Sequence, residues 1–173
     1  MTDRNIEQQY IYGPVPSRRL GCSLGVDIVP FKTCTYDCIY CQLGRTTNKT
    51  TRRKEWVPTD IVIEQLKNKL GSKPDYITLS GSGEPTLFSN LGQLILEIKS
   101  ITDIPVAVLT NGSLLWLSGV RNALKPADLV IPSLDAGTNH IFKYVNRPHP
   151  EITFVKCFKG LWIFARFIMV NTG

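Results

Sequence analysis

The sequence predicts an α/β fold in which parallel strands are covered by helices. Short apolar segments alternate along the chain with stretches whose apolar residues recur at helical spacing. Residues 91–98, for instance, place apolar side chains at i, i+3, i+4 and i+7. The segment 106–109 reads Val-Ala-Val-Leu without polar alternation, which is typical of a strand buried on both faces of a parallel sheet.

The first strand and the first helix are bounded by residues that stop such structures. Residues 13–16, Gly-Pro-Val-Pro, predict a rigid turn ahead of the first ordered element. Residues 23–29 mix apolar and small side chains and end at a proline, which predicts a strand followed by a long loop. Thr59 is a suitable N-cap and Gly71 a suitable stop, so a helix is expected over about 60–70.

Strands and helices continue to alternate through the rest of the chain. The expected elements are strands at 76–80, 106–110 and 129–133 and helices at 91–98, 117–124 and 152–165. In parallel sheets ligands bind at the carboxyl ends of the strands. The residues that directly follow each strand are therefore the candidates for a functional site.

The composition is that of a globular protein. The chain is 43% hydrophobic and 20% charged, so it can bury a core. We expect a single domain over residues 1–173. No signal peptide and no run of about 20 apolar residues is present, so we expect a cytoplasmic location and no membrane partner. The formal charge of +6 favours polyanionic partners such as nucleic acid.

Three of the five cysteines lie close together in the loop after the first strand. The segment Cys34-Thr-Tyr-Asp-Cys38-Ile-Tyr-Cys41 has the spacing C-x3-C-x2-C. Three thiolates from one compact loop can bind one face of an iron–sulfur cube and leave its fourth iron without a protein ligand. Such an open position allows a metal centre to bind a substrate or cofactor.

With Tyr40 directly before the last cysteine, this loop resembles the signature of the radical S-adenosylmethionine (SAM) superfamily. The resemblance implies a [4Fe-4S] cluster on Cys34, Cys38 and Cys41, whose open iron binds SAM. Reduction of the cluster then cleaves SAM to a 5'-deoxyadenosyl radical. An electron donor such as flavodoxin or ferredoxin is implied as well, while the sequence identifies no catalytic side chain.

Further motifs after the expected strands support this resemblance. Residues 81–84, Gly-Ser-Gly-Glu, resemble the family's glycine-glycine-glutamate element, which holds the SAM amino group. The resemblance assigns to SAM the residues Tyr40, Gly81, Ser82, Gly83, Glu84, Asn111, Ser133 and Asp135. Tyr40 would contact the adenine, and the last two residues the ribose or the methionyl carboxylate. Ordinary turn chemistry is the alternative for these polar and glycine residues.

The N-terminal motif, residues 12–27, resembles a narrower branch: small iron–sulfur oxidoreductases related to wyosine-type tRNA-modifying enzymes. This branch implies tRNA as the first candidate substrate, with a protein glycyl residue or a small metabolite as alternatives. Arg18 and Arg19 either bind a phosphate or the SAM carboxylate, or pair with structural carboxylates. The basic segment 45–54 is either a solvated loop or a surface that follows phosphates.

A nonenzymatic module is the alternative from another class of function. It would hold zinc or an iron–sulfur cluster and act through RNA contacts of the basic segment. A zinc site would recruit a fourth ligand from Cys22, His140 or Cys157. We favour the cluster because zinc modules usually pair their ligands, and no second pair is present. The two isolated cysteines are otherwise expected to be buried.

The resemblance implies a partial (β/α) barrel with parallel strands. Only four strand-helix units and the beginning of a fifth can be counted, so we expect the barrel to end after about four to five units, incomplete at the C-terminus. The strongly apolar segment 161–170 would then leave an unpaired strand edge and apolar surface exposed. Such surfaces favour association.

Overall fold

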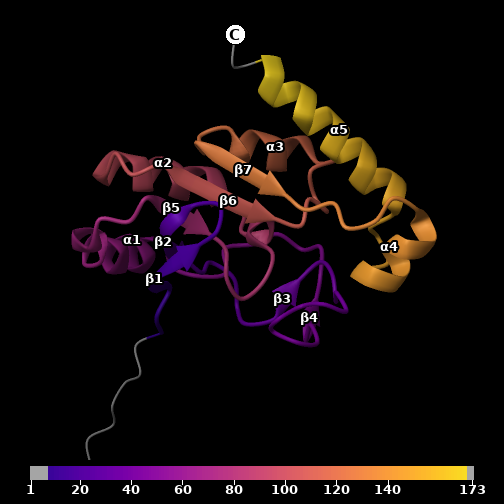
Figure 1. Ribbon diagram of the computed structural model, residues 1–173, viewed down its shortest axis with the longest axis horizontal. Helices are drawn as coiled ribbons and strands as arrows, with labels where there is room; N and C mark the ends of the chain where they lie inside the picture. The colour runs from indigo at the N-terminus through magenta and orange to yellow at the C-terminus, as the bar shows by residue number, and fades with distance from the viewer. Residues whose placement is uncertain (1–7, 171–173) are drawn as a thin grey trace, which may run out of the picture.

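The computed structural model describes residues 8–170, with side chains up to Arg166. In chain order the elements are β1 (Ile11–Ser17), β2 (Gly21–Val26), β3 (Thr33–Cys34), β4 (Asn48–Lys49), α1 (Thr59–Lys67), the 3₁₀ helix η1 (Leu70–Ser72), β5 (Tyr76–Leu79), the 3₁₀ helix η2 (Pro85–Leu87), α2 (Leu91–Ile101), β6 (Val106–Thr110), α3 (Ser118–Leu124), β7 (Leu129–Pro132), α4 (Asn139–Asn146) and α5 (Phe154–Val170). Strands and helices alternate from β5 to β7, as the sequence predicts (Figure 1).

A mostly parallel sheet of five strands forms the centre, in the order β1-β2-β5-β6-β7. The neighbours from β2 to β7 pair in parallel, and β1 pairs with β2 antiparallel. The sheet is open, since β1 and β7 form its two edges in the described part of the chain. The α/β class is therefore confirmed, whereas the expected partial barrel is not.

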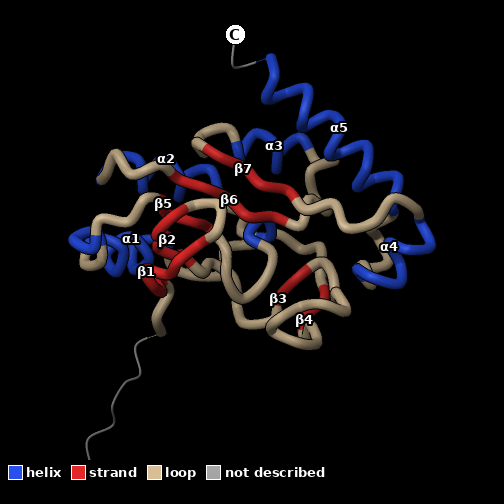
Figure 2. Tube along the Cα trace, in the orientation of Figure 1, coloured by secondary structure: helices blue, strands red, loops and turns tan. Residues whose placement is uncertain are grey.

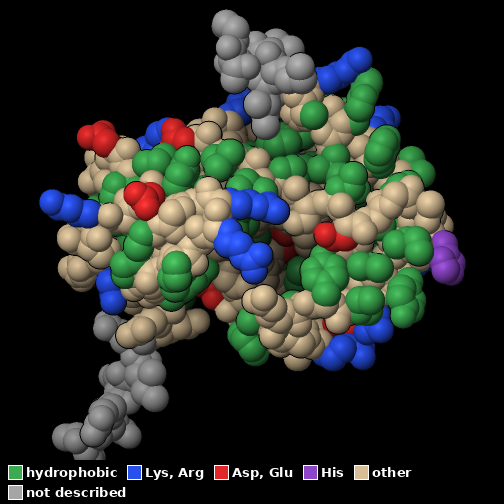
Figure 3. Space-filling model, in the orientation of Figure 1, with side chains coloured by type: hydrophobic (Ala, Val, Ile, Leu, Met, Phe, Trp, Pro, Cys, Tyr) green, Lys and Arg blue, Asp and Glu red, His purple; other side chains and the backbone are tan. Residues whose placement is uncertain are grey.

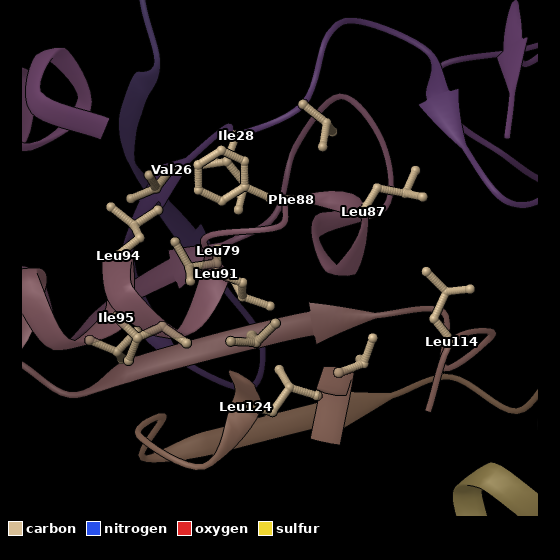
Figure 4. Packing of buried hydrophobic residues seen from close by; sticks show 14 of the residues in the cluster. Val26, Ile28, Leu79, Leu87, Phe88, Leu91, Leu94, Ile95, Leu114 and Leu124 are labelled. Atoms are coloured by element: carbon tan, nitrogen blue, oxygen red, sulfur yellow. The ribbon is translucent and has the colours of Figure 1, made fainter. Parts of the chain in front are cut away.

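Helices α1, α2 and α3 form one layer against the sheet. The strand order advances in one direction from β2 to β7, and right-handed crossovers then place all connecting helices on the same face. α1 packs beside α2, and α2 beside α3. Figure 4 shows Leu91, Leu94 and Ile95 of α2 next to Leu79 of β5. All four are fully buried, and each such side chain contributes roughly 1.5–3 kcal/mol to folding.

Strand β1 was not expected from the sequence. The Gly-Pro-Val-Pro segment that predicts a turn lies inside β1, which contains an irregularity between Tyr12 and Val15 and a cis Gly13–Pro14 peptide. An edge strand pairs on one side only, so prolines lose fewer hydrogen bonds there than in a central strand. Prolines in this segment thus do not exclude a strand.

The helical part differs from the expectation in three places. The helix expected over 60–70 begins at Thr59, whose side chain makes no capping hydrogen bond, and it ends at Lys67, where the 3₁₀ helix η1 follows. Helix α4 was not expected; it is short and begins where the Thr138 hydroxyl accepts a hydrogen bond from the N–H of Ile141 (3.3 Å). The apolar segment 161–170 belongs to helix α5, so it contributes no strand edge.

The long segment between β2 and α1 is mostly loop, with β3 and β4 as short paired pieces (Figure 2). The arrowheads of β6 and β7 point toward the side of the molecule where β3, β4 and α4 lie (Figure 1). The cysteines therefore stand at the carboxyl edge of the sheet. Among the described residues, no helix combines the length and the apolar character that crossing a membrane requires.

Candidate metal centre

The loop that carries the cysteines, residues 30–50 (the cysteine loop), is held in shape by a short parallel ladder. Thr33 pairs with Asn48 and Cys34 with Lys49 in the β3–β4 ribbon. The N–H of Thr50 donates a further hydrogen bond to the carbonyl of Cys34 (3.0 Å). The two ends of the loop thus lie side by side, and its middle, with the other two cysteines, projects as a closed turn.

Amide groups point at two of the three half-buried thiols. The Nδ2 of Asn111 lies 3.5 Å from Cys34 Sγ, and the Nδ2 of Asn146 lies 3.4 Å from Cys38 Sγ. The backbone N–H of Tyr36 also donates to Cys34 Sγ (3.5 Å). Such N–H groups stabilise negative charge on sulfur, which is the form that binds metal.

Burial opposes ionisation of these thiols when no metal is bound. Burial, with a smaller contribution from the Glu84 charge, raises the pKa of Cys34 to about 12. Burial also raises the pKa of Cys38. Charge on Cys38 raises the pKa of Cys34, and charge on Cys41 raises that of Cys38, so the three sulfurs interact electrostatically. A bound cation would remove this penalty.

Three thiols on one loop are a donor set that suits an iron–sulfur cluster. In the described residues, no three His, Cys, Asp or Glu side chains are arranged to hold one ion. A cluster takes one thiolate per iron, so its ligands stand further apart than the ligands of one ion. Amide N–H groups directed at the sulfurs are also the groups that tune iron–sulfur centres.

Glu84 is buried at the turn after β5, with 2% of its surface exposed. Its Oε1 accepts hydrogen bonds from the hydroxyls of Thr86 (2.5 Å) and Thr110 (2.6 Å), and its Oε2 accepts one from the N–H of Asn111 (2.7 Å). Burial raises the pKa of Glu84, and these donors oppose the shift. The carboxyl group therefore links the turn after β5 to the end of β6, and its predicted SAM contact stays a prediction.

The glycines of the same turn allow it to pack against the cysteine loop. A Cβ at Gly83 would lie 1.8 Å from the carbonyl oxygen of Thr33. Gly81 has φ +139°, and a Cβ there would lie 2.7 Å from Cγ of Asp27. Ser82 donates hydrogen bonds from its N–H and its hydroxyl to the Asp27 carboxylate. The turn is thus required by local packing, whether or not it also holds SAM.

Asn111 follows β6 and connects the cysteine loop to the sheet. Besides the contact with Cys34, its Nδ2 donates to the Thr35 hydroxyl (2.8 Å), and its Oδ1 accepts from the N–H of Ser113 (3.0 Å). The Thr35 and Ser113 hydroxyls are themselves 2.7 Å apart and buried. This predicted site residue therefore reaches the cysteines directly.

Two other predicted residues, Tyr40 and Asp135, contact each other. The hydroxyl of Tyr40 donates to Asp135 Oδ2 (2.5 Å), which also accepts from Asn146 Nδ2 (2.8 Å). Burial and this hydrogen bond raise the pKa of Tyr40, so the hydroxyl stays protonated. Because Asn146 also contacts Cys38, the pair is tied to the part of the loop that carries this cysteine.

Ser133 follows β7 and is exposed, while its N–H donates to the Thr110 carbonyl (2.9 Å). Together with Asn111 and Asp135 it borders a hollow of about 10 Å³. Pockets that enclose a ligand of the size of SAM measure roughly 300–1,000 Å³. This hollow is therefore too small to enclose SAM.

Asn146 was missed by the sequence reading. It lies at the end of helix α4, is 2% exposed, and donates to both Cys38 and Asp135. An asparagine at the end of a short helix is common, so nothing in its local sequence distinguishes it. The contact exists because α4 packs against the cysteine loop, where the N–H groups of Asp37 and Ile39 donate to carbonyls of this helix.

Several other candidates lie away from the cysteines. Arg18 and Arg19 occupy the hairpin between β1 and β2, at the amino end of β2 and thus at the opposite edge of the sheet. The interpretation that they bind the SAM carboxylate is therefore not supported. Cys22 is exposed near the same end, which contradicts the expected burial, whereas Cys157 is buried as expected. His140 is exposed in the first turn of α4.

Part of the positive charge of the basic segment 45–54 is engaged within the protein, while Arg45, Lys49, Arg52 and Lys54 stay exposed. Arg45 forms an ion pair with Asp37 (2.8 Å), and Arg53 Nε donates to the Thr86 carbonyl (2.8 Å). The Lys54 ammonium stands 4.1 Å from the centre of the Trp56 ring. This part of the positive charge therefore stabilises the loop itself.

A loop with three cysteines at the carboxyl edge of an α/β sheet is a suitable place for an iron–sulfur centre. The family model described as the Radical SAM superfamily matches residues 28–161, which include the cysteine loop and most of the sheet. The chain belongs to the radical SAM superfamily.

Three curated proteins illustrate its relatives. A protein named GTPase Obg from Brachyspira hyodysenteriae is 50% identical over 167 residues, which cover 95% of this chain and 25% of that protein. A UPF0026 protein from Methanocaldococcus jannaschii is 41% identical over 157 residues, or 88% of this chain and 49% of the relative. A UPF0026 protein from Synechocystis sp. is 39% identical over 157 residues, or 90% of this chain and 59% of the relative. The chain spans about half the length of these UPF0026 relatives.

Proposed function

We propose that this chain carries the SAM-cleaving site of a radical SAM enzyme, with Cys34, Cys38 and Cys41 as ligands of a [4Fe-4S] cluster. When bound, the cluster and SAM supply the chemistry: one electron cleaves the sulfonium to methionine and a 5'-deoxyadenosyl radical, which abstracts a hydrogen atom from the substrate. The protein supplies binding, orientation and exclusion of water.

Different residues around the cysteines would orient the sulfurs and bind SAM. Asn111 and Asn146 donate to two thiol sulfurs and thereby fix their orientation. The backbone of Gly81, Ser82 and Gly83 offers polar groups to the SAM amino group. Tyr40 would contact the adenine, and Ser133 and Asp135 the ribose or the methionyl carboxylate.

The observation that carries the proposal is the position of the three thiols beside polar groups at the carboxyl ends of several strands. Asn111 after β6 and Asp135 after β7 are joined to the cysteine loop by hydrogen bonds. A loop that only held a structural metal would not need contacts from successive strand ends. The nonenzymatic zinc alternative is accordingly not favoured.

The proposal is tested by anaerobic reconstitution with iron and sulfide, followed by incubation with SAM and dithionite. The wild-type chain is expected to bind four iron atoms, as a [4Fe-4S] cluster requires, and to release 5'-deoxyadenosine. Alanine at any of the three cysteine positions is expected to reduce the product to the level of a protein-free control. Cys22→Ala is the matched control and should behave like the wild type, because Cys22 lies at the other end of β2.

Two outcomes contradict the proposal. Zinc without iron in the purified and reconstituted protein would show a mononuclear site. An intact cluster that never cleaves SAM would support a binding-only protein. Iron, sulfide and product are therefore measured on the same samples.

The substrate is proposed to be a tRNA, on the basis of the N-terminal motif and the net charge of +6. A protein glycyl residue or a small metabolite is the alternative, and flavodoxin or ferredoxin is the proposed electron donor. A cytoplasmic location suits such a centre because thiols stay reduced there. Binding of tRNA should weaken steeply as salt is raised, and salt-independent binding would argue against RNA.

GTP hydrolysis is not proposed, despite the printed name of one relative. The match covers a quarter of that protein. Nucleotide hydrolysis of this type uses a phosphate-binding loop with a Gly-Lys-Ser or Gly-Lys-Thr segment. The sequence contains no Gly-Lys pair.

A further inference from the structure

A pocket of about 750 Å³ lies between β4, α4 and the start of α5, and the proposed function does not use it. Its size falls within the range of small-molecule sites. Four of its lining residues are basic or can become so: Lys49, Lys143, Arg147 and His149. On the face shown in Figure 3, hydrophobic side chains and Lys or Arg side chains lie next to each other around this part of the molecule.

The positive charge in the pocket is compensated only in part, through an electrostatic interaction of Arg147 with the Asp37 carboxylate. In the described part of the chain, no carboxylate forms an ion pair with Lys49, Lys143 or Arg147, and no Asp or Glu lines the pocket. Lys49 Nζ donates one hydrogen bond to the Arg147 carbonyl (3.2 Å), which leaves two N–H donors. The nearby Glu151 carboxylate accepts from the Thr51 hydroxyl (2.5 Å). The pocket is thus prepared for an anion.

The segment Arg147-Pro148-His149-Pro150 forms a rigid wall of the pocket. Arg147 has φ +44°, a left-handed conformation that favours glycine and is strained for an arginine. The two prolines fix the backbone around His149. The N–H of His149 donates to the Thr35 carbonyl (2.9 Å), and its Nδ1 accepts from the N–H of Glu151 (3.3 Å). Its Nε2 is therefore the nitrogen that carries a proton and can donate.

The floor of the pocket is aromatic. Phe142 is 5% exposed and Phe154 is half-buried. Their ring centres are 5.9 Å apart at 56°. Aromatic rings beside cations are the combination on which nucleobases stack while their phosphates are held.

We propose that this pocket binds a nucleotide, with the phosphate held by Lys143, Arg147 and His149 and the base against the aromatic floor. The same phosphate-bearing unit occurs in free nucleotides and in nucleic acid. The wall of the pocket is hydrogen-bonded to the cysteine loop, so a bound nucleotide lies directly beside the loop. This inference does not depend on the cluster or on SAM cleavage.

Binding to the full chain is measured by calorimetry and fluorescence anisotropy with four probes. The probes are AMP, adenosine, inorganic phosphate and a labelled single-stranded oligoribonucleotide. AMP is expected to bind at least about tenfold more tightly than adenosine, since its phosphate meets several cations. Excess SAM should not displace AMP, because the two ligands occupy different sites.

Two variants and one control locate the site. Lys143→Gln and Arg147→Gly should each weaken AMP binding by about five- to tenfold. Arg147→Gly should also leave the melting temperature unchanged or raise it, because glycine relieves the strain at φ +44°. Weaker binding in a protein of equal or greater stability cannot be ascribed to misfolding. Lys67→Gln, an exposed lysine in the last turn of α1, should bind like the wild type.

The outcomes distinguish a free nucleotide from nucleic acid as the ligand, and they can overturn the proposal. Tight binding of AMP indicates a free nucleotide, whereas binding of the oligoribonucleotide alone indicates nucleic acid. Equal affinity for AMP and adenosine, displacement of AMP by SAM, or equal weakening in Lys67→Gln overturns the proposal. Absence of binding by all four probes overturns it as well. None of these results bears on SAM cleavage, so the two proposals fail separately.

Discussion

At the scale of single residues, two asparagines on different elements serve the same purpose. Asn111 at the end of β6 and Asn146 at the end of α4 each direct an Nδ2 at a cysteine sulfur. Hydrogen bonds to the sulfurs stabilise the more negative, reduced state of an iron–sulfur cluster. Under the proposed function, these side chains would position the sulfurs and tune the cluster.

Replacing Asn146 by alanine should lower the reduction potential of the reconstituted cluster, since one N–H···S contact is lost. The potential is measured by redox titration with electron paramagnetic resonance detection. Asn122→Ala, an exposed position on α3, is the control. An unchanged or higher potential in Asn146→Ala would contradict the assigned role.

Gly83→Ala should prevent stable folding or cost at least about 3 kcal/mol in the free energy of unfolding, because the new Cβ would overlap the backbone of Thr33. Gly71→Ala is the matched control, as a Cβ there meets nothing within 4 Å. Its effect should stay within about 0.5 kcal/mol. Thermal unfolding of both variants decides the matter, and equal stability of the two would refute the packing argument.

At the scale of elements, an ion pair joins the helix layer to the starts of two strands. Lys99 of α2 contacts Asp128 Oδ1 (2.5 Å), and Asp128 Oδ2 accepts from the N–H of Val106 (2.8 Å). Burial alone would raise the pKa of Asp128, but these two donors outweigh it and hold the pKa below the usual 3.8. The aspartate therefore fastens α2 and β6 together in its charged form.

Asp128→Asn should lower the free energy of unfolding at neutral pH by about 0.5–1 kcal/mol, a modest loss because the pair is partly exposed. A lowered pKa in the folded state gives stability that is present above pH 3.8 and is lost as the pH falls through the folded pKa. The difference between wild type and variant should consequently vanish in acid. Urea unfolding from neutral pH down to about pH 2.5, well below the usual pKa of an aspartate, measures it. A constant difference would contradict the assignment.

At the scale of the whole molecule, helix α5 exposes apolar side chains. Val155, Phe158 and Trp162 are 70%, 53% and 52% exposed along one helix, which extends away from the sheet (Figure 1). Apolar surface of this kind favours association. The sequence predicts exposed apolar surface near residues 161–170. The structure exposes apolar side chains in this part of the chain, on a helix instead of a strand.

The chain should therefore associate as its concentration rises, and Phe158→Glu should shift it toward the monomer. Sedimentation velocity over a concentration series measures the effect. Lys159→Gln, at the exposed neighbouring position, lowers the net charge by the same amount as Phe158→Glu and is the control for a change of charge alone. A wild-type chain that stays monomeric at every concentration would contradict this prediction.

The alternating order of elements could be read from the sequence because it follows from local patterns. The strand at Val106–Thr110 and the helix that begins at Leu91 were predicted closely, since continuous apolar runs and 3.6-residue spacing are strong signals. The edge strand β1 and helix α4 were missed. The turn-forming residues of β1 conceal that it pairs as a strand. The short length of α4 conceals that packing makes it a helix.

The sequence by itself determined the superfamily and the three cysteines, because a ligand spacing within eight residues is local information. Only the tertiary structure decided how that loop is completed. It buried Glu84 as a link between β5 and β6, joined Tyr40 to Asp135, and brought Asn146 from over a hundred residues away to Cys38. These contacts depend on the strand order of the sheet and on the packing of α4, which no local pattern encodes.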